Sequence, residues 1–435
     1  MKKVLIITYY WPPSGGGGVQ RWLKFAKYLP QFGWEPIIFT PENPDFSLKD
    51  DTLQKDVSPE LEVIRFPIWE PFGVYKKLFK SSGKTVKQGI VIEKSKLSLG
   101  DRISIWVRAN LFIPDPRRFW VKSSSNFLKS IVEDNQIDLV ITTGPPHSMH
   151  LIGRRLKNST GVKWIADFRD PWSDWDVLDK LDITSWARAI HRRMEKNVMT
   201  QCDVLLTVSN RLADQLIKKK YGRSMKVVNN GVDEDDFKFD SAIEANGKFK
   251  IVHMGLLNEI RNPEVLWEVL SELCEEDQEF NDQLEIVLAG MVSGSILDQL
   301  RDDQFLGKAL NYLDYLPHQE VFLYYQSASI QLLLLNQSEN AKWILPGKMY
   351  EYMFSGKPIL TLGEPESDVN DMLMECEAGK VIGFDEKEQI RSFVKKAFVD
   401  HQQGIVFKRS ANVLQYSRRN LTEKLSQIMN AACSP

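Results

Sequence analysis

Residues 342–363, KWILPGKMYEYMFSGKPILTLG, combine a turn, a short helix and a strand in one continuous segment. The sequence predicts a turn at 346–348, a helix over 349–354 that stops at Ser355-Gly356, and a buried strand from Pro358. The unpaired N–H groups at a helix start, together with the helix dipole, favour a bound anion. We therefore expect an anion site formed by Pro346, Gly347 and Lys348.

Glu351 is the acidic residue of this predicted helix, and we expect it in the first turn. A carboxylate beside an anion site repels phosphate, whereas it accepts hydrogen bonds from sugar hydroxyls. The combination indicates a nucleotide-sugar site, with the diphosphate on the turn and the ribose on Glu351. The alternative is an acidic side chain that only complements the helix dipole.

The segment from Glu351 to Pro358 resembles the C-terminal signature of family 4 retaining glycosyltransferases. That signature has a glutamate, seven residues and a second glutamate, followed by a small-residue turn and Gly-Lys-Pro. Glu351 matches the second glutamate. The first would fall on Trp343, so this chain departs from the family pattern there.

The composition is that of a globular protein with two or three domains, because the 435 residues are 43% hydrophobic and 26% charged. The net charge of -2 gives no overall attraction to nucleic acid or membranes. Four widely separated cysteines without metal-ligand spacing indicate a reducing compartment. The apolar start, residues 4–8, is interrupted by Trp11-Pro-Pro13 and lacks a cleavage site, so we expect a strand and a cytoplasmic protein.

Residues 74–130 are rich in lysine and arginine, with aromatic side chains between them. Such a region could support peripheral contact with the inner membrane face or attract an anionic acceptor. The alternative is a solvated helical face whose aromatic residues belong to the core. Nucleic acid is not an expected partner, because no recognition motif accompanies the charge.

A glycine loop follows the first predicted strand, Val4–Thr8, and precedes a helix predicted from Val19. Strand, glycine loop and helix is a geometry that binds phosphate on backbone amides. The spacing fits neither the dinucleotide fingerprint nor the P-loop, and a flexible connector is the alternative. In the family that the chain resembles, a glycine of this loop approaches the donor diphosphate. Gly17 and Gly18 occupy the matching positions.

Two polar loops follow the predicted strands 137–142 and 162–166. The first contains Gly144-Pro-Pro-His-Ser148, and the second is Asp167-Phe-Arg-Asp-Pro-Trp172. Because the carboxyl ends of parallel strands meet at one edge of a sheet, we expect these loops to lie together on a ligand-binding edge. A local ion pair between Arg169 and an aspartate is the alternative.

This pair of loops resembles a branch of the same glycosyltransferase family. The resemblance implies that His147 lies near the reacting sugar or helps to position the acceptor hydroxyl. It also implies an acceptor-side role for Asp167, Arg169 and Asp170.

A second series of alternating strands and helices starts at Phe249, after a polar linker predicted over 240–248. In the resembled family, the loop after the first strand of this domain carries Gly-Arg and a lysine five residues later, and both cations neutralise the diphosphate. Here Gly255 is followed by Leu256, and Arg261 holds the lysine position. We expect Arg261 to clamp phosphate and Lys348 to supply the second charge.

Together these features predict an α/β protein with the GT-B fold, in which two Rossmann-like doubly wound domains face a central cleft. Residues 1–240 and a returning C-terminal helix, about 416–435, form the predicted acceptor-side domain. Residues 241–415 form the predicted donor domain.

The resemblance implies a metal-independent retaining hexosyltransferase without a cofactor. Its substrates would be a nucleoside-diphosphate sugar and a saccharide or lipid-linked acceptor, in polysaccharide or glycolipid assembly. Two alternatives stay open: a non-catalytic GT-B scaffold, suggested by Trp343 and Leu256, and a nucleotide-sugar epimerase. The predicted catalytic residues are His147, Glu351 and Arg261, and the predicted donor-binding residues are Gly17, Gly18, Gly255, Arg261, Pro346, Gly347, Lys348 and Glu351.

Overall fold

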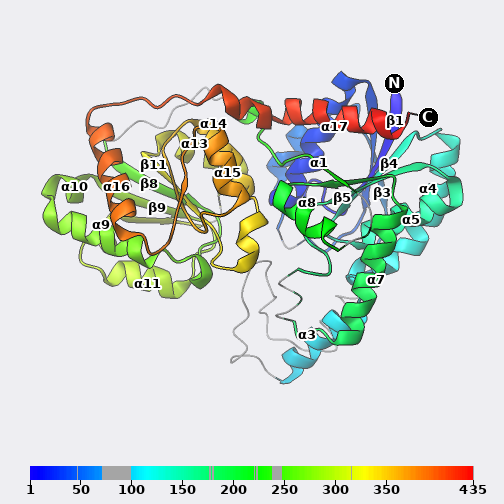
Figure 1. Ribbon diagram of the computed structural model, residues 1–435, viewed down its shortest axis with the longest axis horizontal. Coiled ribbons are helices and arrows are strands. Elements are labelled where there is room, and N and C mark those ends of the chain that lie inside the picture. Colours follow the sequence, from blue (N-terminus) through cyan, green and yellow to red (C-terminus); the bar gives the residue numbers. More distant parts are fainter. Residues whose placement is uncertain are drawn as a thin grey trace. The chain divides into compact units, whose positions relative to one another are not determined.

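The computed structural model describes residues 1–46, 48–70, 99–175, 178, 181–219, 221, 224–237, 247–314 and 316–434. The chain divides into two compact units (Figure 1). Unit 1 is Met1–Asn229 with Leu421–Pro435, and unit 2 is Asn230–Asn420. The predicted linker at 240–248 and the part of the basic region before residue 99 fall mostly or wholly outside the described residues.

Unit 1 contains a seven-stranded parallel sheet in the order β3-β2-β1-β4-β5-β6-β7. Its strands are β1 (Lys2–Ile7), β2 (Trp34–Pro41), β3 (Glu62–Phe66), β4 (Leu139–Gly144), β5 (Lys163–Phe168), β6 (Val204–Thr207) and β7 (Met225–Val227). Its described α-helices are α1 (Gly17–Tyr28), α3 (Leu99–Leu111), α4 (Trp120–Asp134), α5 (Ser148–Thr160), α7 (Ser185–Gln201) and α8 (Asn210–Ile217), joined by most of α17 (Arg418–Ala432).

Unit 2 contains a six-stranded parallel sheet in the order β10-β9-β8-β11-β12-β13. Its strands are β8 (Phe249–Met254), β9 (Leu284–Ala289), β10 (Leu310–Leu313), β11 (Ile330–Leu334), β12 (Ile359–Leu362) and β13 (Val381–Ile382). Its described α-helices are α9 (Glu264–Glu276), α10 (Gln278–Gln283), α11 (Gly294–Asp302), α12 (Leu306–Ala309), α13 (His318–Ser327), α14 (Gly347–Ser355), α15 (Asp368–Glu375) and α16 (Lys387–Gln402).

The core of unit 2 has two layers, one on each face of its sheet. Successive residues of a strand point to opposite faces, so Ile251 packs with α9 and α16, whereas Val252 packs with α13, α14 and α15. Both faces are covered, which is why these strands are continuous apolar runs. The predicted doubly wound sheet is therefore confirmed.

The C-terminal helix packs on the core of unit 1. In Figure 1, α17 runs beside α1 and β1, and its residues Leu421, Leu425 and Met429 are buried with Val4 and Trp22. This burial explains why the end of the chain belongs to the same compact unit as its beginning.

A 3₁₀ helix, η8 (Ala411–Tyr416), precedes α17, and the hydroxyl of Ser417 accepts a hydrogen bond from the Asn420 N–H at 3.3 Å. Ser417 has an extended backbone, ψ 144°, as an N-cap residue requires. In the described ranges, no helix combines the length and the apolar character that a membrane span requires.

Candidate functional site

The glycine loop and the histidine loop of unit 1 meet where the strand order reverses. β1 pairs with both β2 and β4, so the segments that leave β1 and β4 depart from neighbouring strands in opposite directions. Parallel sheets bind ligands at this switch point. The helix α1 starts at Gly17, two residues earlier than predicted from Val19, and Gly16 caps it with a φ of 85°. A methyl group added at Gly17 would meet no atom within 4 Å, so its backbone is open to a ligand.

Arg169 ties these two loops together. Its guanidinium donates to the carbonyls of Gly18 at 2.7 Å, Pro145 at 2.8 Å and Gly144 at 3.3 Å. Burial lowers the pKa of Arg169, and the charges of Asp170 and Asp167 oppose that shift. Arg169 therefore fixes the shape of the edge that carries His147 and Gly18.

Asp167 is engaged inside unit 1. Its carboxylate has no exposed surface and accepts hydrogen bonds from Arg21, from the Trp22 indole at 2.9 Å and from the Thr143 hydroxyl at 2.9 Å. Burial alone would raise its pKa, but the adjacent Arg21 holds the pKa below its usual value. These contacts attach α1 to the sheet, so in this arrangement the Asp167 side chain has no surface to offer an acceptor. Its acceptor-side role stays a prediction.

His147 is 6% exposed, and within the described residues neither of its buried ring nitrogens makes a hydrogen bond of good geometry, although the Pro171 backbone lies close enough to raise the pKa of His147 slightly. The imidazole stacks on the Trp172 ring, with centroids 4.7 Å apart and planes 2° apart. Burial lowers the pKa of His147 well below its usual value, and the nearby His150 and His191 lower it further. His147 is therefore a neutral imidazole with unmet hydrogen-bonding capacity. Leaving a buried polar atom unpaired costs roughly 1–3 kcal/mol.

The switch point of unit 2 brings together the predicted donor residues that belong to this unit. Gly255 follows β8 with a φ of 119°, a backbone conformation that favours glycine. The Lys348 ammonium donates to the Met254 carbonyl at 2.9 Å and would lie 3.8 Å from a methyl group added at Gly255. Arg261 donates to the carbonyl of Leu256 at 3.2 Å and to the Asn336 side chain at 2.5 Å. Asn336 follows β11, the strand paired with β8.

The two cations of this site disfavour each other. Burial and, to a lesser extent, the charge of Arg261 lower the pKa of Lys348 to about 7, because Glu351 only partly offsets them. Burial also lowers the pKa of Arg261. A bound anion would stabilise the charged form of Lys348, so this site favours a polyanionic ligand.

Glu351 lies in the second turn of α14, so its predicted place in the first turn is wrong. The helix starts at Gly347 because Pro346 already serves as its N-cap, with an extended ψ of 132°. The Glu351 carboxylate accepts a hydrogen bond from the Tyr325 hydroxyl at 3.0 Å, and its charge adds to the burial that raises the pKa of Tyr325. Sequence reasoning missed Tyr325, because it lies on α13 and only packing brings it to Glu351.

Two positions depart from the family pattern that the sequence resembles. Leu256 contributes its carbonyl to Arg261, and Trp343 ends the 3₁₀ helix η7 (Glu339–Trp343). Neither side chain supplies a charge, so the cations of this edge are Arg261 and Lys348. Pro346 and Gly347 lie at the start of α14, where its first backbone amides are located.

Residues 90–236 match the model described as Glycosyltransferase Family 4. This third of the chain includes both polar loops of unit 1, those of His147 and Arg169. No curated protein sequence matches the chain.

Several solved structures share the fold of nearly the whole chain. A glycosyltransferase from Rickettsia africae is 13% identical, with a TM-score of 0.62 over 99% of this chain and 98% of that one. Sucrose-phosphate synthase from Thermosynechococcus elongatus is 12% identical, with a TM-score of 0.61 over 99% of both chains. A putative UDP-N-acetylglucosamine 2-epimerase from Listeria monocytogenes is 11% identical, with a TM-score of 0.56 over 99% and 96%.

At these identities the structural likeness shows the fold alone, which is GT-B with two Rossmann-like domains. The solved structures confirm the predicted GT-B fold, and the family match confirms the predicted resemblance to family 4 glycosyltransferases over residues 90–236. The roles of the individual site residues and the absence of a cofactor stay predictions.

Proposed function

We propose that this chain, a GT-B protein whose residues 90–236 match glycosyltransferase family 4, transfers a sugar from a nucleoside-diphosphate donor to an acceptor hydroxyl with retention at the transferred carbon. The observation that carries the proposal is the meeting of Arg261, Lys348 and the start of α14 at the switch point of unit 2.

The diphosphate leaving group is assigned to this switch point. Arg261 offers a planar fork of donors, Lys348 a point charge, and the first amides of α14 a positive dipole end. Positive groups that are held in place before the reaction stabilise developing negative charge at little reorganisation cost. In this proposal the protein's own cations supply the charge that a metal ion supplies elsewhere.

Glu351 is assigned to the ribose of the donor. Tyr325 donates to one of its carboxylate oxygens, and because each carboxylate oxygen accepts more than one hydrogen bond, Glu351 can also accept from a ribose hydroxyl. A carboxylate one turn into α14 is also far enough along the helix to leave the first amides to the phosphates.

The acceptor side is assigned to unit 1. The neutral imidazole of His147 is assigned to a sugar or acceptor hydroxyl, an assignment that requires one of its buried ring nitrogens to become accessible, while Arg169 keeps its loop next to Gly18. Gly17 and Gly18 offer amides to the donor phosphates, and Asp170 is assigned to the acceptor. The acceptor's proton passes to the departing diphosphate oxygen on the same face of the sugar. This pathway requires no separate protein base.

The acceptor is proposed to be a saccharide or a lipid-linked saccharide at the cytoplasmic membrane face, as in polysaccharide or glycolipid assembly. The support is compositional: residues 74–130 are basic and aromatic, as a surface near anionic acceptors would be.

A thermal-shift panel of UDP, GDP, CDP and their sugar conjugates tests the donor site. A true donor at 100 times its Kd stabilises the chain by about 2.7 kcal/mol. Glu351→Ala should remove most of this shift. Glu366→Ala, which changes an exposed acid of the same unit, should retain it. No stabilisation by any nucleotide would contradict the proposal and favour a non-catalytic scaffold.

Product analysis separates the transferase from an epimerase of the same fold. With donor but no acceptor, a transferase releases free sugar slowly and an epimerase returns an isomerised nucleotide sugar. Formation of the isomer would overturn the proposed reaction while leaving the donor site intact.

A further inference from the structure

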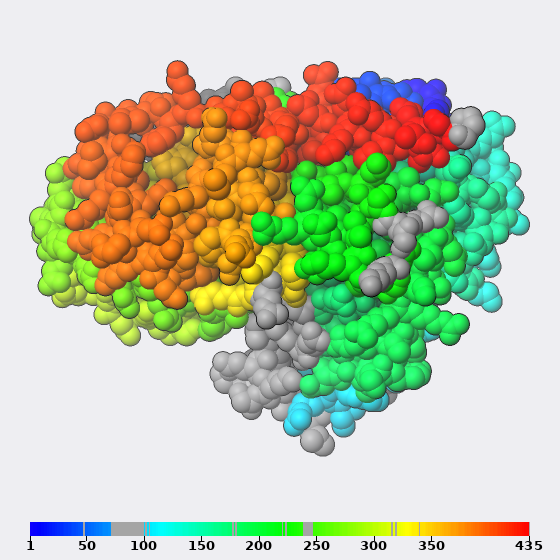
Figure 2. All heavy atoms as spheres, viewed as in Figure 1, coloured from blue at the N-terminus to red at the C-terminus, as the bar shows by residue number. Residues whose placement is uncertain are grey.

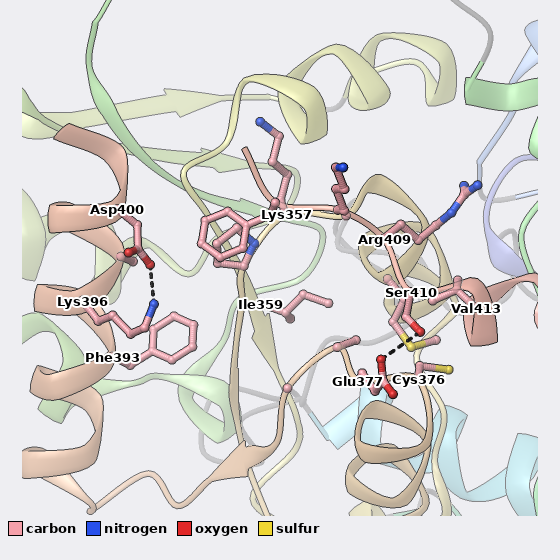
Figure 3. Close-up of a pocket in the computed structure, with 18 residues that line it drawn as sticks. Lys357, Ile359, Cys376, Glu377, Phe393, Lys396, Asp400, Arg409, Ser410 and Val413 are labelled. Carbon is pink, nitrogen blue, oxygen red and sulfur yellow. Dashed lines mark hydrogen bonds and ion pairs between the residues drawn. The ribbon is translucent and has the colours of Figure 1, made fainter. Parts of the chain in front are cut away.

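A cavity of about 280 Å³ lies in unit 2 at the edge opposite to the donor residues (Figure 3). Lys357, Pro358 and Ile359, which line it, lead into β12, whereas Gly255 follows the carboxyl end of β8. In a parallel sheet these two ends are opposite edges. The cavity is therefore separate from the proposed donor site.

The cavity walls carry more positive than negative charge. The cations are Lys357, Lys396, Lys408 and Arg409, and the acids are Glu377 and Asp400, which leaves a balance of four minus two, or +2. The chain as a whole carries -2, so this excess is local.

Most of these charges already have partners. Lys396 pairs with Asp400 along α16, and Glu377 accepts a hydrogen bond from Ser410, as the dashed lines of Figure 3 show. The Arg409 guanidinium lies over the Phe354 ring, 3.6 Å from its centroid.

Lys357 and Lys408 differ from the other charged residues of the cavity in their hydrogen bonding. Within the described residues, neither ammonium group has a hydrogen bond or an ion pair. Burial lowers the pKa of Lys357, which a nearby anion would reverse. Two unpaired ammonium groups on one cavity favour a phosphate or another compact anion.

An exposed apolar turn borders the same cavity. Ile405, Val406 and Phe407 follow the end of α16 and are 47%, 83% and 39% exposed. Phe407 also lines the cavity. In Figure 2 the orange-red segment after α16 lies on the surface of the face shown. These three exposed apolar side chains are followed directly by two cationic residues, Lys408 and Arg409. The segment therefore places apolar and positively charged groups next to each other.

We propose that the segment 404–410 docks unit 2 on an anionic phospholipid surface. Ile405, Val406 and Phe407 enter the interface, and Lys357 and Lys408 hold a lipid phosphate at the mouth of the cavity. A soluble phosphate compound would explain the two lysines but would leave the apolar turn exposed to water. The apolar turn with its adjacent cations is what favours a membrane surface over a free ligand.

Vesicle flotation of the full chain, without nucleotide, tests the inference. Vesicles of phosphatidylcholine alone are compared with vesicles that also contain phosphatidylglycerol. The chain should float with the anionic vesicles only. The double variant Lys357→Gln and Lys408→Gln should bind them about 25-fold more weakly, because each cation near an anionic surface contributes about fivefold. Val406→Ser should weaken binding as well.

Matched controls separate this surface from others on the chain. Lys308→Gln with Lys380→Gln removes two other cations of unit 2, and Met374→Ser removes another exposed apolar side chain. These variants should float like the parent chain. Equal binding by parent and Lys357/Lys408 variant would overturn the proposal, since another surface such as residues 74–130 would then be responsible.

Thermal-shift titration with inorganic phosphate and glycerol 3-phosphate tests whether the cavity binds a soluble phosphate compound instead of a lipid phosphate. If these compounds stabilise the parent but not the Lys357/Lys408 variant, and no variant changes vesicle binding, the cavity is a small-molecule site and the membrane proposal is wrong. The test needs no donor binding, so it can fail or succeed independently of the proposed glycosyl transfer.

Discussion

The two switch points have the same strand arrangement but different electrostatics: the edge of unit 1 is neutralised within the chain, and that of unit 2 carries two cations. In unit 1 the charged groups are satisfied internally: Arg21 pairs with Asp167, and Arg169 donates to backbone carbonyls. His147, on the same edge, is neutral. In unit 2, Arg261 and Lys348 disfavour each other with only Glu351 to offset them. In the proposed function, the first edge would face neutral hydroxyl groups and the second a polyanion.

The largest expected effect is on stability, when the buried ion pair of unit 1 is broken. Asp167→Asn leaves the Arg21 guanidinium buried without its counter-charge, so the free energy of unfolding should fall by about 3–5 kcal/mol. Urea denaturation measures this change. Glu133→Gln, which removes a surface pair with Lys129, should cost no more than about 1 kcal/mol. A similar small loss for both variants would show that the neutral edge does not depend on the buried pair.

A smaller effect is expected from removing one cation of unit 2. Arg261→Leu should weaken nucleoside-diphosphate binding about 100-fold, because a charge-assisted pair contributes roughly 1.5–3 kcal/mol. Calorimetric titration measures the affinity. Arg301→Leu, at an exposed position of α11, is the control and should bind like the parent chain. If Arg261→Leu binds normally, the polyanion edge has been misassigned.

The smallest effect is a pH dependence that only unit 2 should show. Lys348 has a pKa of about 7 in the unliganded chain, and a bound diphosphate should raise it. Binding then takes up a proton, so the affinity should fall by up to tenfold for each pH unit above about 7 until the pKa of the complex is reached.

Calorimetric titrations between about pH 6 and pH 9 measure this slope. Lys348→Met should flatten it, whereas Lys357→Met, at the other edge of the sheet, should retain it. Ionisation of the nucleotide itself affects the parent chain and both variants equally. The difference in slope between the parent chain and the Lys348 variant therefore reports the proton on Lys348. An equal slope in the Lys348 variant would assign the proton to another group.

The sequence predicted the fold because its signals are local. The apolar run 249–254 coincides with strand β8, and the run 330–335 covers strand β11 and one further residue. Gly356, with a φ of 71°, ends α14 where predicted. The sequence predicts the ends of helices less well where backbone geometry, and not residue type, decides where the helix starts. Pro346 could belong to a turn or cap a helix, and its extended backbone, followed by a helical Gly347, placed Glu351 one turn later than expected.

The contacts of the candidate site were not predictable in the same way. Arg21 and Asp167 are 146 residues apart, and Tyr325 and Glu351 lie on different helices. No periodicity or turn pattern relates such residues. The proximity of Lys348 to Gly255 similarly depends on β8 and β11 being neighbours, although 94 residues separate Lys348 from the Met254 carbonyl that it contacts.

By itself the sequence determined the alternation of strands and helices and placed polar residues at strand ends, because backbone propensity, apolar periodicity and turn chemistry act over a few residues. The tertiary structure decided which of those residues share a charge environment. Strand order brought Arg261 to Lys348 and buried Asp167 against Arg21, and burial in a medium of low polarity turned these neighbours into one anion-seeking edge and one neutral edge.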